Sequence, residues 1–480
     1  MNTKLKVGIL TFSDGRQYIH ESLEPLNRRY QDELAAALNA TGQVEVIAGR
    51  EIIWNQRVAQ AEARRLAESG CDLTILNYAI WCYPHLSAVA TAFAPGPYLL
   101  FCNVHPSEPG MVGMLAAAGT MDQLDRKYTR VWGRISDPQV LARVMSYVKA
   151  AGALSRLRGQ TYGLFGGRPL GMYTAVSNLD QWQKMFGLDV EHVEQQDVVE
   201  HSKQVEDTRV EQAFKWLTKH VGQIKYDGKA LTPEKLKLQI RSYYAYRRII
   251  EDRRLDFVGT KAHGDLTDHF VTVDVAEAFL NDPYDWDGPH EPIVAATEAD
   301  MDAALTMQIF KHLTGKPVLF SDVRHYDADD DVWYLSNSGT HATYFAGRSD
   351  DPKVNLKEVT FYPECSYYPA GGASVHHFAA EGRVTLARLA RKDGRYWMAI
   401  VPGEFVRFPR AKMLEKGSTV TPEWPIAFTR IACPADEFLG RYPCNHIHGC
   451  YGDWQRELLH VAGILGIEAR VFGSESDRQA

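Results

Sequence analysis

Residues 294–326, VAATEADMDAALTMQIFKHLTGKPVLFSDVRHY, carry the pattern that decides the fold. The short apolar run at residues 294–296 predicts a strand. Apolar residues then recur at close to helical intervals over residues 301–313, which predicts a helix, and Gly315 is typical of a helix end. A second apolar run at residues 317–320 predicts another strand. The stretch therefore has the strand–helix–strand order of a parallel α/β unit.

Each of the two predicted strands is followed by a carboxylate. Glu298 comes at the end of the first strand, and Asp322 stands just past the second. In parallel α/β units, residues at the carboxyl ends of the strands face one crevice, where ligands bind. We therefore expect Glu298 and Asp322 to point into the same pocket. The alternative is that Glu298 caps the helix and that Asp322 is an ordinary loop residue.

The composition is that of a globular chain with more than one domain. At 480 residues the chain is too long for one hydrophobic core, which predicts two or three domains. The net charge of −7 argues against a nucleic-acid partner, and no apolar run reaches the roughly 18 residues of a membrane span. The seven cysteines are scattered along the sequence, which is typical of reduced thiols. Residues 1–4 lead directly into a predicted strand, a pattern unlike that of a signal peptide. We therefore expect a cytoplasmic protein without a nucleic-acid or membrane partner.

The distribution of predicted strands and helices divides the chain into three sections. Residues 1–157 alternate strands with helices, and residues 158–322 begin this alternation again, which predicts two α/β domains with parallel sheets. Residues 323–480 carry β-rich runs separated by Gly, Asp and Pro turns, which predicts a β-rich C-terminal domain. The expected fold class is thus α/β, with two parallel-sheet domains followed by a β-rich domain. The second domain carries Glu298 and Asp322.

A glycine-rich turn follows the first predicted strand of the second section. Residues 166–171, GGRPLG, could cradle a phosphate, as in a dehydrogenase that binds a dinucleotide. The turn lacks the G-x-G-x-x-G spacing and the Gly-Lys-Ser/Thr sequence of phosphate loops, and Pro169 stands at its centre. A tight chain reversal is the favoured interpretation.

The segment 444–450, CNHIHGC, concentrates residue types that bind metals. On a strand its cysteines and histidines would share one face, spread over roughly 20 Å, so they could not close around one zinc ion. One or two of the histidines could instead join carboxylates from elsewhere. Two carboxylates and one imidazole suit Mn²⁺ or Mg²⁺. The alternative is that His446 and His448 are half-buried strand histidines.

Several longer motifs resemble the L-fucose isomerase family, and the resemblance runs along most of the chain in the family's order. The motifs are VGILTFSDGR at residues 7–16, IWCY at 80–83, LTDHFVTVDVAEAFLNDPYDWDG at 266–288, ATEADMDAALTMQIFKHLTG at 296–315, VLFSDVR at 318–324, LSNSG at 335–339, GGASVHHF at 371–378, EWP at 423–425 and NHIHGCYGD at 445–453. The resemblance implies two α/β domains followed by a β-rich domain, as the three sections predict.

The resemblance also implies a metal site and a sugar-binding site. The metal ligands would be Glu298, Asp322 and His446, with Mn²⁺ expected and Mg²⁺ or Co²⁺ as alternatives. His448 lies outside the Asn–His pair that carries the match, and the stretch KAHG at 261–264 departs from a glutamine-bearing stretch of the family. The residues expected to contact the sugar are Arg16, Trp81, Tyr368, Trp424 and Asn445. The alternatives are a solvated turn residue for the arginine and core packing for the tryptophans.

The reaction that the resemblance implies is aldose–ketose isomerisation. L-Fucose would become L-fuculose, D-arabinose would become D-ribulose, or both, through a cis-enediol intermediate. Glu298 and Asp322 would be the acid–base pair, and a divalent cation would stabilise the developing negative charge. The resemblance further implies a homohexamer, in which Arg16 and Trp81 serve their own or a neighbouring subunit. The alternatives are an enzyme like L-arabinose isomerase and a non-catalytic sugar-binding protein.

Overall fold

The computed structural model describes residues 4–338 and 340–474. Gly339, which ends the LSNSG motif, and the tail from residue 475 lie outside the described residues. No helix among the described residues is long and apolar enough to cross a membrane.

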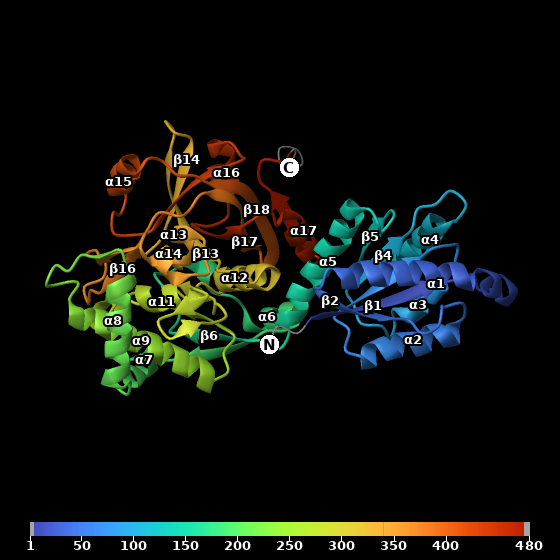
Figure 1. Ribbon diagram of the computed structural model, residues 1–480, viewed down its shortest axis with the longest axis horizontal. Coiled ribbons are helices and arrows are strands. Elements are labelled where there is room, and N and C mark those ends of the chain that lie inside the picture. The colour runs from blue at the N-terminus through green and yellow to red at the C-terminus, as the bar shows by residue number, and fades with distance from the viewer. Residues whose placement is uncertain (1–3, 339, 475–480) are drawn as a thin grey trace. The chain divides into compact units, whose positions relative to one another are not determined.

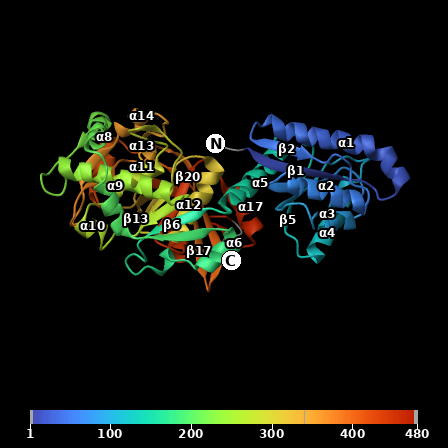
Figure 2. The same ribbon diagram turned by 90° about the horizontal axis from the view of Figure 1, so that it is seen from below.

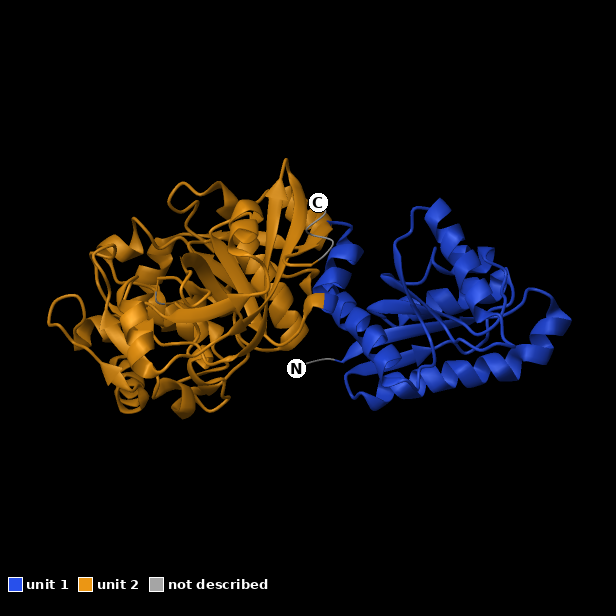
Figure 3. Ribbon diagram, turned by 90° about the horizontal axis from the view of Figure 1, so that it is seen from above, with its two compact units in different colours: residues 1–155, 456–467 blue, residues 156–455, 468–480 orange. Residues whose placement is uncertain are grey.

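The chain forms two compact units, which Figure 3 shows in different colours. Unit 1 consists of residues 1–155 and 456–467, and unit 2 of residues 156–455 and 468–480. The helix near the C-terminus, α17 (Gln455–Leu465), thus belongs almost entirely to unit 1. A further division near residue 322 stays a prediction.

Unit 1 is a parallel five-stranded sheet with helices on both faces. Its strands, in the order β2-β1-β3-β4-β5, are β1 (Leu5–Phe12), β2 (Val44–Ala48), β3 (Leu73–Tyr78), β4 (Tyr98–Cys102) and β5 (Tyr128–Trp132). One face packs against α1 (Gln17–Ala40) and α5 (Pro138–Leu157), and the other against α2 (Gln56–Glu68), α3 (His85–Ala90) and α4 (Gly110–Gln123). Figure 2 shows α1 and the helices α2 to α4 on opposite sides of the sheet.

Unit 2 begins with a second parallel sheet, of order β12-β9-β6-β7. Its strands are β6 (Thr161–Phe165), β7 (Asp189–Val193), β9 (Phe257–Thr260) and β12 (Ala295–Thr297). The helices of this part are α6 (Leu179–Phe186), α7 (Gln195–Ser202), α8 (Asp207–His220), α9 (Pro233–Asp252), α10 (Leu266–His269), α11 (Asp274–Asn281) and α12 (Met301–Thr314). The glycine-rich turn after β6 leads into a short 3₁₀ turn, Tyr173–Ala175.

The C-terminal part of unit 2 is built on a seven-stranded, mainly antiparallel sheet, whose strands β14, β17 and β18 are labelled in Figure 1. Its order is β17-β20-β13-β14-β19-β18-β21, and β17 also pairs with β18, so these strands close into a barrel with β21 added outside. The strands are β13 (Leu319–Asp327), β14 (Val332–Ser336), β17 (Gly382–Lys392), β18 (Arg395–Phe405), β19 (Ile426–Ile431), β20 (His446–Tyr451) and β21 (Glu468–Val471). A mixed, strand-rich sheet thus follows parallel sheets, which confirms the predicted fold class.

Smaller elements complete unit 2. A three-stranded sheet has the order β16-β15-β8, and β10 pairs with β11. The bounds of these elements are β8 (Gln223–Ile224), β10 (Tyr284–Asp285), β11 (Gly288–Pro289), β15 (Thr360–Pro363), β16 (Ala373–His376), α13 (Tyr344–Gly347), α14 (Pro352–Leu356), α15 (Arg410–Ser418) and α16 (Ala435–Arg441).

The helix α12 lies between the two large sheets of unit 2 and is buried on nearly all sides. It contacts β9 and β12 of the parallel sheet and β17 and β20 of the barrel. The strand after it, β13, pairs with β14 and β20 in the barrel and not with β12. The prediction of one parallel strand–helix–strand unit is therefore wrong. Asp322 also lies inside β13, not past its end.

Candidate active site

Glu298 lies at the carboxyl end of β12, where the chain turns abruptly into α12. Glu298 and Ala299 both have left-handed backbone conformations, with φ of 57° and 47°. Residues other than glycine rarely adopt this conformation, and it concentrates at functional sites. Asp300 then begins the helix, because its side chain accepts a hydrogen bond from the backbone N–H of Ala303 (2.9 Å). The helix cap is Asp300 and not Glu298.

Asp322 and His446 lie directly opposite one another on the neighbouring antiparallel strands β13 and β20. Side chains of opposite residues on such a pair meet on one face of the sheet. Nε2 of His446 lies 3.5 Å from Oδ1 of Asp322 and 3.2 Å from Oε2 of Glu298. The structure thus brings together the three residues predicted to bind a metal, although Glu298 comes from a different sheet.

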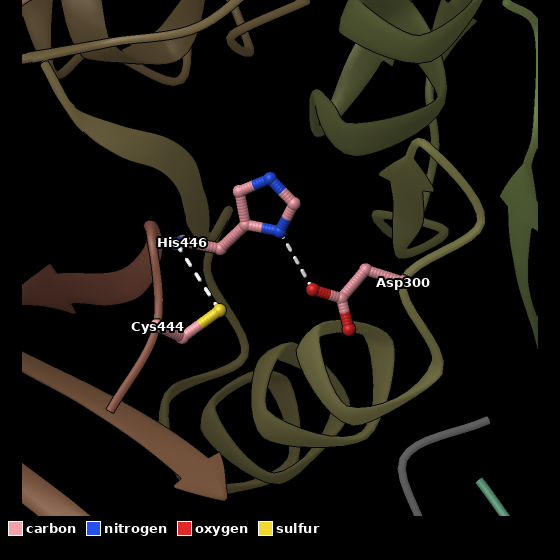
Figure 4. A group of neighbouring side chains, drawn as sticks. All are labelled: Asp300, Cys444 and His446. Carbon is pink, nitrogen blue, oxygen red and sulfur yellow. Dashed lines mark hydrogen bonds and ion pairs between the residues drawn. The ribbon is translucent and has the colours of Figure 1, made fainter. Parts of the chain in front are cut away.

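Asp300 fixes the orientation of the His446 imidazole. Nδ1 of His446 donates a hydrogen bond to Oδ2 of Asp300 (2.6 Å), and Arg388 grips both oxygens of the same carboxylate (2.7 and 3.0 Å). Figure 4 shows that the second ring nitrogen of His446 points away from Asp300. A carboxylate that accepts from one imidazole nitrogen leaves the lone pair of the other nitrogen available to bind a metal.

The Nε2 lone pair of His446 is buried and faces two carboxylates, an arrangement that favours a bound cation. Nε2 of His446 is buried and has no hydrogen-bond partner within the described part of the chain. Burial disfavours the charged imidazole, but Asp300, Glu298 and Asp322 outweigh burial and raise the pKa of His446 well above its usual value. Burial is likewise outweighed at Glu298, where His263 and His446 lower the pKa to about 2. A proton or a metal ion must therefore occupy the space between this nitrogen and the carboxylates.

Asp300, Cys444 and His446 also place three possible ligand atoms close together (Figure 4). Both oxygens of Asp300 are already engaged by Arg388 and by Nδ1 of His446. Cys444 lies outside β20, and its thiol donates a hydrogen bond to Oδ1 of Asn445 (3.3 Å). The donors that remain available face the other side of the imidazole, toward Glu298 and Asp322.

Two amides hold the Asp322 carboxylate. Asn337 donates to Oδ2 (2.7 Å), and Asn445 donates to Oδ1 (3.0 Å). Burial and the nearby Glu298 raise the pKa of Asp322, although His446 and these amides oppose the shift. Asn445 is exposed while His446 is fully buried, so the site opens to solvent on the side of Asn445. Asn445, predicted to contact the sugar, thus contacts a predicted metal ligand.

Three aromatic side chains from three loops, His263, Tyr368 and Trp424, form a row that begins beside Glu298, which we call the aromatic wall. Nε2 of His263, which follows β9, lies 3.7 Å from Oε1 of Glu298. The His263 ring packs on the ring of Tyr368 with centroids 5.2 Å apart, and Tyr368 packs on Trp424 with centroids 6.3 Å apart. Tyr368 and Trp424 are both nearly buried. The structure therefore connects these two predicted sugar contacts to the carboxylate through His263.

His448 lies on the same strand as His446 but has a different partner. Its Nε2 lies 3.1 Å from Nη1 of Arg388, which is the donor of that contact. Burial, together with the positive charge of Arg388, lowers the pKa of His448 well below its usual value. Both histidines are completely buried, so the expectation of half-buried strand histidines is wrong.

Arg16 and Trp81 belong to unit 1. Arg16 follows β1 and forms a two-bond fork with Asp14 (2.9 and 2.7 Å), and about half of its side chain is exposed. Trp81 follows β3 and is half-buried. These two strands are adjacent and parallel, and the order of the sheet reverses between them. Loops at such a switch point form ligand-binding crevices.

Several residues of the site escaped prediction from the sequence. Asp300 has the position of an ordinary helix cap, and its partners Arg388 and His446 are far away in the chain. His263 lies in the stretch KAHG, which departs from the family's pattern, so the resemblance gives it no role. Asn337, within the LSNSG motif, is a residue that the motif could have indicated.

Comparisons with known proteins agree with this architecture. Sequence models of three L-fucose isomerase domains match the chain: the first N-terminal domain over residues 4–159, the second N-terminal domain over residues 256–315, and the C-terminal domain over residues 335–472. An L-fucose isomerase of Bacteroides thetaiotaomicron is 23% identical over 96% of this chain and 92% of its own length. L-Fucose isomerases of Haemophilus influenzae and Klebsiella pneumoniae are 24% and 22% identical, over 97% and 94% of this chain and 92% and 88% of their own lengths.

These matches make the chain an enzyme of the aldose–ketose isomerase class. It belongs to the L-fucose isomerase family. The matched second N-terminal domain contains Glu298, and the matched C-terminal domain contains His446.

Proposed function

We propose that this enzyme converts L-fucose to L-fuculose and D-arabinose to D-ribulose through a cis-enediol, with Mn²⁺ as its preferred cation. The observation that carries the proposal is the unsatisfied Nε2 of His446, which faces Glu298 and Asp322. The names of the relatives support L-fucose as substrate. We further propose a cytoplasmic homohexamer.

Glu298, Asp322 and His446 would hold the cation. Hard carboxylate oxygens with one imidazole suit Mn²⁺, with Mg²⁺ or Co²⁺ as alternatives, and suit the soft-ligand metals less well. When bound, such an ion would polarise the substrate oxygens and stabilise negative charge that develops on them. Asp300 and Arg388 would keep the imidazole in the required tautomer.

Glu298 and Asp322 are the proposed acid–base pair. Isomerisation requires that one group removes a proton from C2 and that a proton is delivered to C1 of the same sugar. Asp322 is held by the amides of Asn337 and Asn445. Glu298 faces the pocket through Oε1, near His263. The two carboxylates therefore come from different elements, and which of them begins the reaction depends on the configuration of the sugar.

Trp424 and Tyr368 would pack against the apolar face of the sugar, and Asn445 would hydrogen-bond its hydroxyl groups. Arg16 and Trp81, from the switch point of unit 1, are also proposed to contact the sugar, whether they serve their own or a neighbouring subunit.

A screen of aldoses with the Mn²⁺-loaded enzyme tests the proposal. L-Fucose and D-arabinose share their configuration at C2 to C4 and differ by a methyl group at the far end. An apolar group of that size is worth about 1–3 kcal/mol, so we expect kcat/KM values within roughly two orders of magnitude of each other. L-Arabinose should be poor, because misplaced hydroxyls leave buried polar groups unpaired. A strong preference for L-arabinose would contradict the proposed substrate, and no ketose from any aldose would contradict the reaction.

A further inference from the structure

The indole of Trp424 is anchored by one buried carboxyl group. Its Nε1–H donates to both Oε1 and Oε2 of Glu364, at 2.9 and 3.1 Å. Glu364 directly follows β15 and is 5% exposed, and Trp424 is 6% exposed. The backbone N–H of Cys365 donates to Oε2 as well (2.6 Å). Glu364 therefore sets the orientation of a side chain that stands in the aromatic wall beside Glu298.

A second carboxyl group lies behind the first. Asp274, the first residue of α11, is 1% exposed and is hydrogen-bonded to Glu364. Its Oδ2 accepts a hydrogen bond from the hydroxyl of Thr272 (2.8 Å). Two carboxyl groups in contact in a buried place cannot both be ionised, because the like charges repel and neither is solvated. The pair must hold at least one proton.

The hydrogen-bond donors determine which member keeps that proton. Glu364 accepts hydrogen bonds from the indole N–H and a backbone N–H, whereas Asp274, among the described residues, accepts one from the hydroxyl of Thr272. Donors stabilise the ionised form, so Asp274 keeps the proton and donates it to Glu364. Burial raises the pKa of Asp274 well above its usual value and raises the pKa of Glu364 to about 7. Glu364 thus changes its charge near neutral pH while Asp274 remains protonated.

We propose that Glu364 is a positioning residue for the sugar: its ionised carboxylate, backed by the carboxyl group of Asp274, holds the Trp424 indole firmly in the substrate pocket, and protonation of Glu364 loosens that hold. A hydrogen bond to an ionised acceptor is roughly twice as strong as one to a neutral acceptor. The inference rests on the proposed function in one respect, namely that Trp424 contacts the sugar.

The other titratable groups around the pair keep their charge near neutral pH. Burial raises the pKa of Cys365 to about 12 and that of Tyr368 well above its usual value, while burial lowers the pKa of His376 to about 4. His376, on β16, donates from Nδ1 to the backbone oxygen of Trp424 (2.9 Å). Burial also keeps Glu277 of α11 protonated, by raising its pKa well above the usual value.

Two charged groups remain at the edge of this region. The guanidinium of Arg324 lies over the Trp424 ring, 5.5 Å from its centroid, and is always charged. Glu423 precedes Trp424 in the chain, and its negative charge contributes to the raised pKa of Cys365. Glu364 is therefore the group whose charge change acts directly on the indole, and Glu423 provides a matched control.

The first experiment observes the indole itself and does not depend on activity. In protein labelled with ¹⁵N-tryptophan, the indole N–H resonance of Trp424 is identified by its loss in Trp424→Phe. In the wild-type protein this resonance should move downfield as the pH rises through about 7. In Glu364→Gln, which mimics the protonated acid and still accepts the indole hydrogen bond, the resonance should not titrate. Glu423→Gln should behave as wild type. A Trp424 resonance that titrates equally in Glu364→Gln overturns the proposal.

The second experiment measures the Michaelis constant for L-fucose in the Mn²⁺-loaded enzyme across the same pH range. The wild-type KM should fall about three- to tenfold as Glu364 ionises, given the difference between neutral and charged hydrogen bonds. The KM of Glu364→Gln should stay at the value that wild type has at low pH, with Mn²⁺ content unchanged. If the resonance titrates as expected while KM remains constant in wild type, Glu364 does not position the sugar. If no ketose forms from any aldose, the proposed function fails, and the resonance still reports on the anchor.

Discussion

Asp300 determines which nitrogen of His446 faces Glu298 and Asp322. It accepts the Nδ1 hydrogen and is itself neutralised by the two-bond fork of Arg388, with both side chains almost fully buried. Such an arrangement fixes the tautomer and increases the basicity of the free nitrogen. The charge of this residue therefore matters for metal affinity even though its oxygens do not face the proposed cation.

Asp300→Asn should weaken Mn²⁺ binding by about 10- to 100-fold, because partners of this kind have effects of that size on metal affinity. Isothermal titration of the metal-free protein with Mn²⁺ measures the change. Asp302→Asn is the matched control, since Asp302 is also buried and paired with an arginine, Arg391, and the other hydrogen bonds of its carboxylate come from the hydroxyls of Ser177 and Tyr396. Equal losses in both variants would mean that Asp300 acts through general stability alone.

His446 and His448 provide a matched pair on one strand, since both are completely buried. His446→Ala removes the nitrogen that faces the two carboxylates, so Mn²⁺ occupancy should fall to near zero at ligand concentrations that saturate wild type. His448→Ala removes a partner of Arg388 and should lower the melting temperature while occupancy is largely retained. Elemental analysis after dialysis measures both. Equal Mn²⁺ occupancies in the two variants, or a larger loss in His448→Ala, would show that His446 is not the metal ligand.

The residues proposed as metal ligands could be predicted from the sequence, but their hydrogen-bond partners could not. Carboxylates after apolar runs are a local pattern, so Glu298 and Asp322 were accessible from the residues alone. The metal-like segment indicated one or both of its histidines, and the family resemblance selected His446. Asp300 looks like a helix cap, which it is, and nothing local indicates that Arg388, on β17 of the barrel, donates hydrogen bonds to it. Glu364 similarly shows no local pattern, because its partner Trp424 lies on a distant loop.

At the scale of elements, the sharp turn between β12 and α12 places Glu298. Glu298 and Ala299 have positive φ, and Ala299 is nearly fully buried. Left-handed conformations cost roughly 1–2 kcal/mol for an ordinary L-residue, so the surrounding structure must impose this turn.

Substitution of Ala299 tests that strain. A β-branched side chain is strongly disfavoured at positive φ, so Ala299→Val should lower the melting temperature and reduce Mn²⁺ affinity by moving Glu298. Ala299→Gly adopts positive φ without strain and should preserve Mn²⁺ affinity within about threefold. Thermal denaturation and Mn²⁺ titration of the two variants give the comparison. Normal affinity in Ala299→Val would show that the turn does not position the carboxylate.

The strand after α12 shows why the element-level prediction failed in part. An apolar run has the same sequence pattern in a parallel and in an antiparallel sheet. The helix before β13 favours a parallel sheet, which is why the sequence predicts a parallel strand there. Its hydrogen-bonding partner β20 lies more than a hundred residues later, so only tertiary pairing reveals the barrel. The β13–β20 pairing places Asp322 opposite His446, so these two residues lie together as predicted although the predicted topology was wrong.

At the scale of the whole molecule, the two units contribute different features. Unit 2 carries the carboxylates, His446 and the aromatic wall, and unit 1 carries a switch point with Arg16 and Trp81. The parallel sheet of unit 1 was predicted because apolar, strand-like runs alternate with helix-like segments along residues 1–157. The helix α17, near the end of the sequence, belongs almost entirely to unit 1, whose larger part is residues 1–155, and no local pattern reveals this.

If Arg16 and Trp81 contact the sugar, as proposed, their substitution should weaken substrate binding and leave metal binding unchanged. Trp81→Ala and Arg16→Gln should raise KM for L-fucose by about tenfold or more, since each removes a group expected to contact the sugar. Mn²⁺ affinity should remain that of wild type. Arg130→Gln, which changes an exposed arginine on β5, is the control. Unchanged kinetics in Trp81→Ala and Arg16→Gln would show that these two side chains do not contact the sugar.

In the proposed mechanism, Glu298, Asp322 and His446 hold a cation on which aldose isomerisation depends. The most direct measurement titrates the chelator-treated enzyme with Mn²⁺ and follows bound metal and ketose formation from L-fucose in the same samples. We expect no ketose without metal, a rise in activity that parallels occupancy and ends near one ion per chain, and neither response in Glu298→Gln or Asp322→Asn. Full activity in the metal-free enzyme, or wild-type occupancy and turnover in both variants, would contradict this mechanism.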